Sequence, residues 1–527
     1  MAKIDGLVKK MTPQLTQSAI TFGDQWISID DINCIANLKT PVALSDNQKF
    51  QNKIRRGELF LEKLLKEDGL IYGVTTGYGD SCVNVVPLEL VSELPLHLLR
   101  FHGCGLGAYF TDQQSRAIIA VRLCSLAQGV SGVSHALLEQ LVTFLNHDIV
   151  PVIPQEGSVG ASGDLTPLSY LAAVLMGERD ARYHGKKMLA KKVLKKLNIK
   201  PITLKPKEGL AIMNGTAVMT AIACEAYQRT EYLCRLSARL TAMACTALKG
   251  NAFHFDKKLF SFKPHKGQQM VAHWIRSDLT YDEPLSRNSY RLQDRYSLRC
   301  APHVIGVVQD SLPWFKMMIE NEINSVNDNP VIDGETECVL HGGHFYGGHI
   351  ATVMDTMKTQ VANLADLLDR QMALLMDPKF NNGLPPNLSA ASKARASINH
   401  GFKAVQIGVS AWTAEALKNT MPASVFSRST ECHNQDKVSM GTIAARDCLR
   451  VLELTEQVVA AHLLACTQAI SIRLSTNDLR NNDISKSVSD MINSVLQEFK
   501  IVTEDRPLDL SLRQFIENIR QRKWELY

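Results

Sequence analysis

The chain contains 527 residues, of which 45% are hydrophobic and 21% are charged, and its formal net charge is +5. This length exceeds what one hydrophobic core usually spans, so we expect more than one subregion, and the composition excludes wholesale disorder or a fibrous repeat. The small net charge, with basic residues in short clusters such as 186–187 and 191–192, indicates no nucleic-acid partner.

Cysteine spacing and hydropathy predict a cytoplasmic protein with no membrane span. The twelve cysteines are spread along the chain with no Cys-x-x-Cys pair, which favours reduced thiols over a disulfide framework or a zinc site. The first ten residues lack the apolar core of a signal peptide. The most apolar run, 458–472, contains His462 and Gln468 and is too short to cross a bilayer, so we expect a buried helix there.

The first predicted elements are a helix at 47–65 and a mobile loop at 71–80. The helix is indicated by apolar residues interleaved with charged ones at helical spacing. The loop reads Ile-Tyr-Gly-Val-Thr-Thr-Gly-Tyr-Gly-Asp, and its three glycines and β-branched residues suit a helix poorly. Judged by composition alone, Tyr72 in this loop is more often a surface or core residue than a catalytic one.

The segment 95–107, Pro-Leu-His-Leu-Leu-Arg-Phe-His-Gly-Cys-Gly-Leu-Gly, places an aromatic ring beside an imidazole. Phe101 offers an apolar wall, and His102 offers a hydrogen-bond partner for a phenol or an imidazole. The Gly103-x-Gly105-x-Gly107 spacing does not form a dinucleotide site, because no strand precedes it and the spacing is wrong. No nucleotide cofactor is therefore expected.

The stretch 157–167, Gly-Ser-Val-Gly-Ala-Ser-Gly-Asp-Leu-Thr-Pro, can be converted into an electrophile. In a turn of residues this small, the Gly163 nitrogen can reach the Ala161 carbonyl carbon, because Gly160 and Gly163 have no Cβ. Loss of water from the closed ring and from Ser162 would leave a methylidene conjugated to an imidazolone, with an electron-poor carbon that no ordinary side chain provides. An isolated Ala-Ser-Gly is usually only a flexible polar turn.

Three further motifs and four long helices follow. An apolar helix is predicted from Leu165 to Met176. Long helices are predicted at 217–249, 304–326, 351–377 and 442–474, with a kink or late start in the second because of Gly306 and Pro313. Loops and short helices are expected between Phe253 and Asp294. The motifs are Glu-Gly-Leu-Ala-Ile-Met-Asn-Gly-Thr at 208–216, Gln-Asp-Arg-Tyr-Ser-Leu-Arg at 293–299 and His-Asn-Gln-Asp at 433–436.

These motifs together resemble the aromatic amino acid ammonia-lyase and aminomutase family, over about residues 72–440. Members of that family convert Ala-Ser-Gly into a methylidene-imidazolone (MIO) prosthetic group. The resemblance implies that Ala161, Ser162 and Gly163 form MIO in this chain. Most relatives have Asn where this chain has His344. A metal held by His341, His344 and His349 is not expected, because glycine-rich spacing gives no preformed ligand face.

The resemblance also implies roles for the matching residues. Tyr72 would remove the substrate β-proton, and Asn214 would hydrogen-bond the MIO carbonyl and the substrate carboxylate. Arg299 would clamp that carboxylate bidentately, which lysine cannot do, and Tyr296 would lie beside the amino group. Catalytic roles thus fall on Tyr72, Ala161, Ser162, Gly163, Asn214 and Tyr296. Substrate-binding roles fall on Phe101, His102, Gln293, Arg299, Phe345, Glu415, Asn434 and Gln435.

For the fold, we expect a mainly α-helical protein built as an elongated bundle of long helices. The predicted parts are residues 1–215 with the Tyr72 loop and MIO, 216–475 as the long-helix bundle, and 476–527 as a helical cap. The family resemblance implies a homotetramer whose active sites gather residues from more than one subunit.

The expected reaction is loss of ammonia from an aromatic L-amino acid. Tyrosine is the favoured substrate, because His102 can meet its hydroxyl while Phe101 packs on its ring. Histidine is second, since histidine lyases also have His at the second selectivity position and Glu415 could bind an imidazole. Phenylalanine would leave His102 unpaired. Two alternatives are an aromatic 2,3-aminomutase and, against the evidence of the intact motifs, an inactive helical scaffold.

Overall fold

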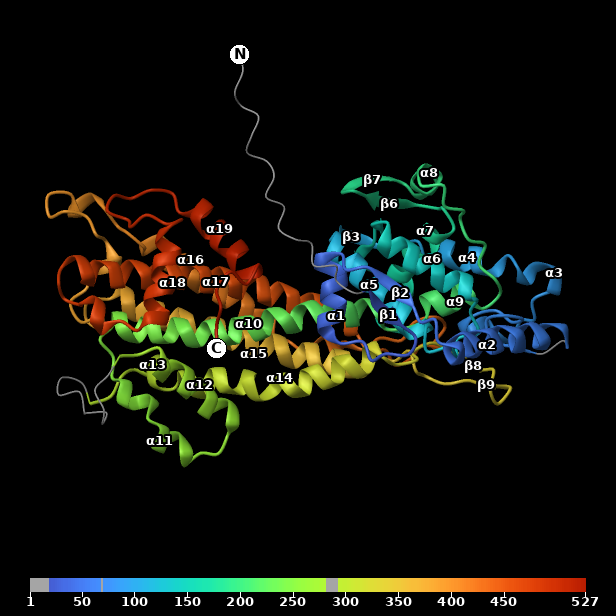
Figure 1. The fold of residues 1–527 in the computed structure, drawn as a ribbon, viewed down its shortest axis with the longest axis horizontal. Helices are drawn as coiled ribbons and strands as arrows, with labels where there is room; N and C mark the ends of the chain where they lie inside the picture. The colour runs from blue at the N-terminus through green and yellow to red at the C-terminus, as the bar shows by residue number, and fades with distance from the viewer. Residues whose placement is uncertain (1–18, 68–69, 281–291) are drawn as a thin grey trace, which may run out of the picture. The chain divides into compact units, whose positions relative to one another are not determined.

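The structure, a computed structural model, describes residues 19–67, 70–280 and 292–527 (Figure 1). It is mainly helical, which confirms the mainly α-helical part of the predicted fold class. The chain divides into two compact units. The first is formed by residues up to 224 together with 319–347 and 427–442, and the second by 225–318, 348–426 and 443–527.

The first unit combines short helices with small sheets. The predicted helix at 47–65 is confirmed as α2, and the apolar helix after the Ala-Ser-Gly segment is confirmed as α7. The helices are α1 (Ile29–Asn33), α2 (Gln48–Lys66), α3 (Leu88–Val91), α4 (Leu94–Phe101), α5 (Asp112–Leu126), α6 (His135–Asn146), α7 (Leu165–Leu175), α8 (Ala190–Lys196) and α9 (Glu208–Met213).

The strands of the first unit pair in short ladders. β1 and β2 are parallel, β3 pairs with β5, β8 pairs with β9, and β4, β6 and β7 form an antiparallel sheet in which Val150 faces Arg182. The strands are β1 (Ile20–Phe22), β2 (Val42–Leu44), β3 (Leu106–Tyr109), β4 (Ile149–Pro151), β5 (Pro154–Glu156), β6 (Asp180–Tyr183), β7 (Lys186–Leu189), β8 (Val331–Asp333) and β9 (Cys338–Leu340).

A hydrophobic cluster anchors the loop that carries Tyr72. Ile71 and Val74, on either side of the tyrosine, are buried against Phe60 and Leu61 of α2 and Ile332 of β8. Burial of each aliphatic side chain contributes about 1.5–3 kcal/mol. The loop therefore has a fixed base, although the glycines between its apolar residues prevent a regular helix.

The second unit contains the predicted long helices, which run side by side in Figure 1. Three of them, α10, α15 and α17, match the predicted ranges to within a few residues. The helices that lie wholly or mostly in this unit are α10 (Ala217–Ala247), α11 (Lys257–Ser261), α12 (Lys266–Ser277), α13 (Tyr296–Arg299), α14 (Ala301–Ile323), α15 (Gly348–Met376), α16 (Lys403–Lys418), α17 (Gly441–Ser475), α18 (Lys486–Leu496) and α19 (Asp509–Arg520).

Two expectations for this unit are refined. α14 begins at Ala301 and continues through Pro313, so the late start predicted for that helix is wrong. Short helices and loops follow α10 as expected, but residues 281–291 of the predicted Phe253–Asp294 segment lie outside the described residues.

Polar side chains join the long helices inside the apolar core. Gln371 of α15 donates a hydrogen bond to Thr241 of α10 (3.0 Å), and its side-chain oxygen lies 3.1 Å from Nε2 of His462 on α17. Burial lowers the pKa of His462 to about 3, so the ring is neutral at pH 7. The apolar run 458–472 is therefore part of a buried bundle helix, as its sequence predicts.

A buried ion-pair cluster provides a test of this packing. Glu456 of α17 accepts hydrogen bonds from Arg229 Nε of α10 (2.8 Å) and from Arg520 Nε of α19 (2.7 Å). Glu456→Ala leaves Arg229 buried without this carboxylate, so we expect a loss of roughly 3–5 kcal/mol in the free energy of unfolding. The matched control Glu453→Ala, on the same helix, removes an exposed pair with Arg450 and a weaker electrostatic attraction to Arg229, and is expected to cost less than about 1 kcal/mol. Equal destabilisation in urea denaturation would contradict this assignment.

Candidate active site

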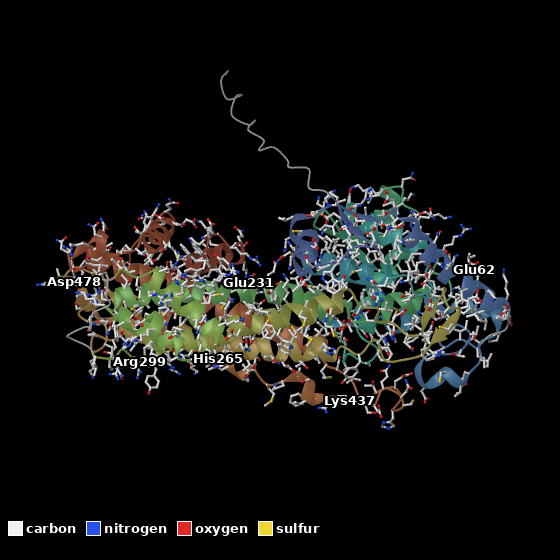
Figure 2. The ribbon with its side chains drawn as sticks, turned by 60° about the horizontal axis from the view of Figure 1, so that its bottom comes forward. Glu62, Glu231, His265, Arg299, Lys437 and Asp478 are labelled. Atoms are coloured by element: carbon white, nitrogen blue, oxygen red, sulfur yellow. The ribbon has the colours of Figure 1, made fainter. Side chains whose placement is uncertain are left out.

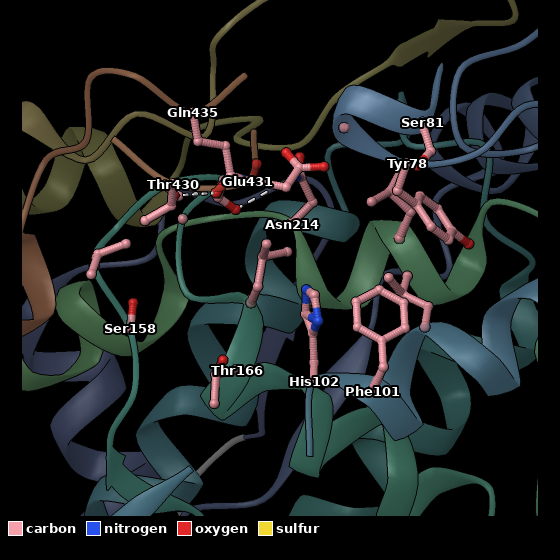
Figure 3. A pocket seen from close by; sticks show the side chains of 18 of the residues that line it. Tyr78, Ser81, Phe101, His102, Ser158, Thr166, Asn214, Thr430, Glu431 and Gln435 are labelled. Carbon is pink, nitrogen blue, oxygen red and sulfur yellow. Dashed lines mark hydrogen bonds between the residues drawn. The ribbon is translucent and has the colours of Figure 1, made fainter. Parts of the chain in front are cut away.

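A cavity of about 650 Å³ in the first unit collects side chains from segments far apart in the sequence (Figure 3). It is lined by the Tyr72 loop, the end of α4, the Ala-Ser-Gly turn, the end of α9 and the loop 427–442. Of the predicted site residues, those that line it are Tyr72, Phe101, His102, Ala161, Ser162, Gly163, Asn214 and Gln435. Tyr72 and Gln435, which are 363 residues apart in the sequence, therefore line the same cavity.

The Ala-Ser-Gly turn forms one wall of the cavity, just before α7. Gly160 and Gly163 have φ angles of +69° and +72°, in the left-handed region that favours glycine. A Cβ at Gly163 would lie 2.1 Å from the Gly215 carbonyl oxygen, so the close approach of the two backbones also requires glycine. The Gly215 N–H donates to the Ser162 carbonyl (3.2 Å) and the Asp164 N–H to the Gly215 carbonyl (2.7 Å).

Asn214 lies beside this turn with an unused hydrogen-bond acceptor. Its side-chain nitrogen donates to the Ser162 carbonyl at 3.3 Å, whereas its side-chain oxygen is buried with no hydrogen-bond partner among the described residues. Its own backbone carbonyl accepts a hydrogen bond from the buried Arg122 (3.0 Å). Because an unpaired buried amide oxygen is unfavourable, this oxygen marks a place where a donor belongs.

A buried charge network supports Asn214 from behind. Arg122 is fully buried, and burial lowers the pKa of its guanidinium to about 10, opposed by the carboxylates of Asp328 and Asp164. Lys207 and Asp328 form an ion pair of 2.7 Å with both side chains fully buried. Removing one member of such a pair is costly, so the network fixes the backbone on which Asn214 sits.

Tyr72 points its hydroxyl at the backbone of its own loop. The Gly79 N–H donates to the Tyr72 hydroxyl oxygen at 2.8 Å. Burial raises the pKa of Tyr72 above its ordinary value, the Gly79 hydrogen bond opposes this by stabilising the phenolate, and the Glu431 carboxylate adds to the rise. The phenol is therefore held protonated at neutral pH, with one N–H ready to stabilise its anion.

Phe101 and His102 project side by side into the cavity, as Figure 3 shows. Their ring centroids are 4.3 Å apart, with an edge-to-face angle of 85°. Burial, aided by the charge of Arg179, lowers the pKa of His102 to about 4, so its ring is neutral at pH 7. A neutral imidazole offers one donor and one acceptor, and within the described residues neither ring nitrogen has a hydrogen-bond partner.

Glu431 is a cavity residue that the sequence reasoning did not select. Its carboxylate accepts hydrogen bonds from the Asp80 N–H (2.8 Å) and from the Asn434 side chain (2.9 Å), so it joins the loop 427–442 to the loop of Tyr72. Asn434 does not itself line the cavity. The signal that could have found Glu431 is its position three residues before the Asn-Gln pair, within the same polar loop.

Five other predicted site residues do not line this cavity. Phe345 belongs to the first unit and is half-buried, whereas Gln293, Tyr296, Arg299 and Glu415 belong to the second. The Arg299 guanidinium lies over the Tyr296 ring, 4.6 Å from its centroid, and Tyr296 is 72% exposed. Glu415 accepts a hydrogen bond from Arg450 at 2.7 Å. Figure 2 labels Arg299 among the side chains of the second unit.

Comparison with known proteins decides the family. The family described as aromatic amino acid lyase matches residues 27–497. The chain belongs to the aromatic amino acid lyase family. It is therefore a carbon–nitrogen lyase, and the resemblance seen in the motifs is confirmed.

Individual relatives are similar over most of their length. Histidine ammonia-lyase of Bacillus subtilis is 37% identical over 429 residues, which are 81% of this chain and 83% of the relative. Among solved structures, tyrosine aminomutase of Streptomyces globisporus has a TM-score of 0.89 at 29% identity and covers 96% of this chain and 97% of its own. Phenylalanine aminomutase of Pantoea agglomerans has a TM-score of 0.87 at 32% identity, covering 95% and 98%.

The position of Glu431 predicts how Tyr72 titrates. Glu431→Gln removes a negative charge that disfavours the phenolate but keeps an oxygen for the Asp80 N–H, so the pKa of Tyr72 falls. The measurement is the ultraviolet titration difference between each protein and its Tyr72→Phe counterpart. Asp436→Asn, which neutralises an exposed acid of the same loop, serves as control. An unchanged or raised Tyr72 pKa in Glu431→Gln would show that the carboxylate does not act on the phenol.

Proposed function

We propose that this enzyme eliminates ammonia from an aromatic L-amino acid, with L-tyrosine preferred and 4-coumarate as product. The observation that carries the proposal is the Phe101–His102 pair in the wall of the cavity, an apolar ring beside a neutral imidazole. The aromatic side chain of the substrate packs on Phe101. Its phenol hydroxyl donates to, or accepts from, the unpartnered imidazole of His102.

The cavity wall fits the MIO group that the family resemblance implies for Ala161, Ser162 and Gly163. Gly160 and Gly163 have the positive φ angles of a tight glycine turn, the conformation that ring closure between the Gly163 nitrogen and the Ala161 carbonyl carbon requires. The Asn214 side-chain nitrogen and the Gly215 N–H, which both donate to the Ser162 carbonyl, are positioned to hold the carbonyl of that group. When present, MIO supplies an electron-poor carbon for the substrate amine.

The chain's own residues perform the proton and positioning work in this proposal. Tyr72 loses its phenol proton before the reaction and, as the phenolate, accepts the β-proton, while the C–H electron pair forms the double bond and the C–N bond breaks. The Gly79 N–H stabilises the phenolate that exists before this transfer, and the transfer returns Tyr72 to the phenol. Asn214 holds the substrate carboxylate, and Arg299, which does not line this cavity, would hold it from a neighbouring subunit.

We propose that the active enzyme is a homotetramer, as the family resemblance implies. Tyr296 and Arg299 are stacked on each other at the surface of the second unit and line no part of the first unit's cavity within the described residues. In the assembly they would complete the cavity of a neighbouring subunit. We also propose a cytoplasmic location, which the twelve free cysteines support.

Histidine is the second candidate substrate, because a specific observation favours it. Relatives 35–37% identical over more than four-fifths of this chain are histidine ammonia-lyases. The His102 ring could also pair with a substrate imidazole. However, Glu415, the residue expected to bind that imidazole, is already paired with Arg450, which favours tyrosine. An aminomutase reaction is distinguished by its product, a β-amino acid.

The substrate panel is the direct test. Purified enzyme is incubated separately with L-tyrosine, L-histidine and L-phenylalanine, and coumarate, urocanate, cinnamate and ammonia are measured. We expect the highest kcat/KM with tyrosine. His102→Leu is expected to lower kcat/KM for tyrosine about tenfold, the value of one hydrogen bond, while phenylalanine is spared. A preference for histidine would replace tyrosine with the second candidate, and a β-amino acid without ammonia would show an aminomutase.

Ser162→Ala tests the source of the electrophile. The variant has no hydroxyl to lose as water, so we expect turnover of every substrate to fall at least about 10³-fold. The fold should survive, because the Ser162 contacts in the turn are made by its backbone carbonyl. Circular dichroism and thermal unfolding provide the control. Normal turnover by a well-folded Ser162→Ala would refute the mechanism.

A further inference from the structure

The end of α4 is held in place by an arginine from another part of the first unit. Arg179, in the turn before β6, donates through Nη2 to the carbonyl of Leu99, one of the last carbonyls of the helix. Its Nη1 donates to Ser169 Oγ (3.0 Å), which lies 3.2 Å from the carbonyl oxygen of His102. Carbonyls at a helix C-terminus have no partner within the helix, so these contacts fix the end of α4 and the backbone position of His102.

The backbone at Arg179 is in a conformation that arginine adopts at a cost. Its φ angle is +60°, in the left-handed region, where a residue with a Cβ is disfavoured by about 1 kcal/mol. Such a conformation persists where surrounding contacts over-determine it. The guanidinium supplies those contacts, because it hydrogen-bonds Leu99 and Ser169 and lies 4.3 Å from the centroid of the Tyr170 ring.

The residue after His102 is shaped to admit this guanidinium. A Cβ at Gly103 would lie 2.0 Å from Arg179 Nη2, so no other residue type fits there without displacing the arginine. The carbonyl of Leu99, the backbone of His102 and the absent side chain of Gly103 therefore form a socket for one cation. This socket is formed by backbone atoms at the end of α4, whereas the side-chain rings of Phe101 and His102 enter the cavity.

We propose that Arg179 is a specificity-determining positioning residue, which clamps the end of α4 so that the His102 ring faces the substrate side chain. This inference rests on the proposed function for the identity of that side chain. Arg179 does not line the cavity and touches no reacting atom in this account. It acts through the backbone of Leu99 and through the Ser169 hydroxyl.

The charge of Arg179 has a second effect on the same ring. After burial, Arg179 is the next cause of the lowered pKa of His102. The neighbouring Glu178 is paired with Arg100 at 2.5 Å, and the other titratable groups that line the cavity are Tyr72, Tyr78 and Glu431. A neutral imidazole can accept a hydrogen bond from a phenol, whereas an imidazolium can only donate. The charge of Arg179 therefore adds to burial in favouring the neutral ring.

The test compares Arg179→Gly with Arg179→Lys. Glycine accepts φ of +60° without strain, so the fold is expected to survive while the clamp and its charge are lost. Lysine keeps a charge but cannot reach Leu99 and Ser169 together. The control is Arg182→Lys, since Arg182 lies three residues away and donates instead to Phe110 (3.1 Å) and Asp112 (2.7 Å).

Two readouts are measured in the full-length enzyme. The first is the pKa of His102 from NMR titration of protein labelled at histidine Cε1, with the resonance assigned by its absence in His102→Leu. The second is the ratio of kcat/KM for L-tyrosine to that for L-phenylalanine. In Arg179→Gly we expect a higher His102 pKa and a kcat/KM ratio reduced at least about tenfold. The lower ratio should come mainly from a higher KM for tyrosine, whereas kcat for phenylalanine should change less. Arg179→Lys should lower the ratio with a smaller change in pKa.

Each outcome decides the proposal. An unchanged ratio in a folded Arg179→Gly would overturn it, and so would equal changes in Arg182→Lys, because these would show a general structural effect. If the wild-type enzyme turns over none of the three amino acids, the proposed function fails. The NMR titration then still decides whether Arg179 controls His102, since it needs no substrate.

Discussion

The buried carboxylate of Asp164 is the interaction on which the site depends. It follows Gly163 directly, and one oxygen accepts the N–H groups of Val218 and Met219 at the start of α10, each at 3.0 Å. The other oxygen accepts from Ser158 and Thr442. Burial raises the pKa of Asp164, while these donors favour the anion. One side chain thus ties the Ala-Ser-Gly turn to two other segments and to Ser158 of its own stretch, so the turn is preorganised.

Much of the fold and half of the site follow from local patterns. The long helices are readable because Ala, Leu, Met and Cys recur every three to four residues without interruption, as in α10. The glycines at 160 and 163 predict a backbone that only glycine tolerates, and their φ angles agree. The segments that carry Tyr72, His102 and Asn214 do meet in one cavity. Composition alone does not predict that these segments share a site, whereas the combined motifs do.

The rest depends on contacts that no local pattern announces. Arg179 reaches a carbonyl 80 residues away, from a left-handed turn where its type is not expected. Glu431 has only its place before the Asn-Gln pair to separate it from other polar loop residues, and only the folded loops show that it lines the cavity. The second-unit residues Tyr296 and Arg299 carry strong motif signals, but a single chain's sequence does not say which subunit's cavity they serve.

In the proposed mechanism a turn becomes an electrophile, and neighbouring elements hold it and select the substrate. The central claim is that Ala161, Ser162 and Gly163 are chemically changed in the mature chain. The most direct measurement is the mass of the proteolytic peptide that contains residues 157–167, with fragmentation to locate any change. The account predicts a peptide lighter by two waters, with the loss confined to these three residues. A peptide of full, unmodified mass from active enzyme would contradict it.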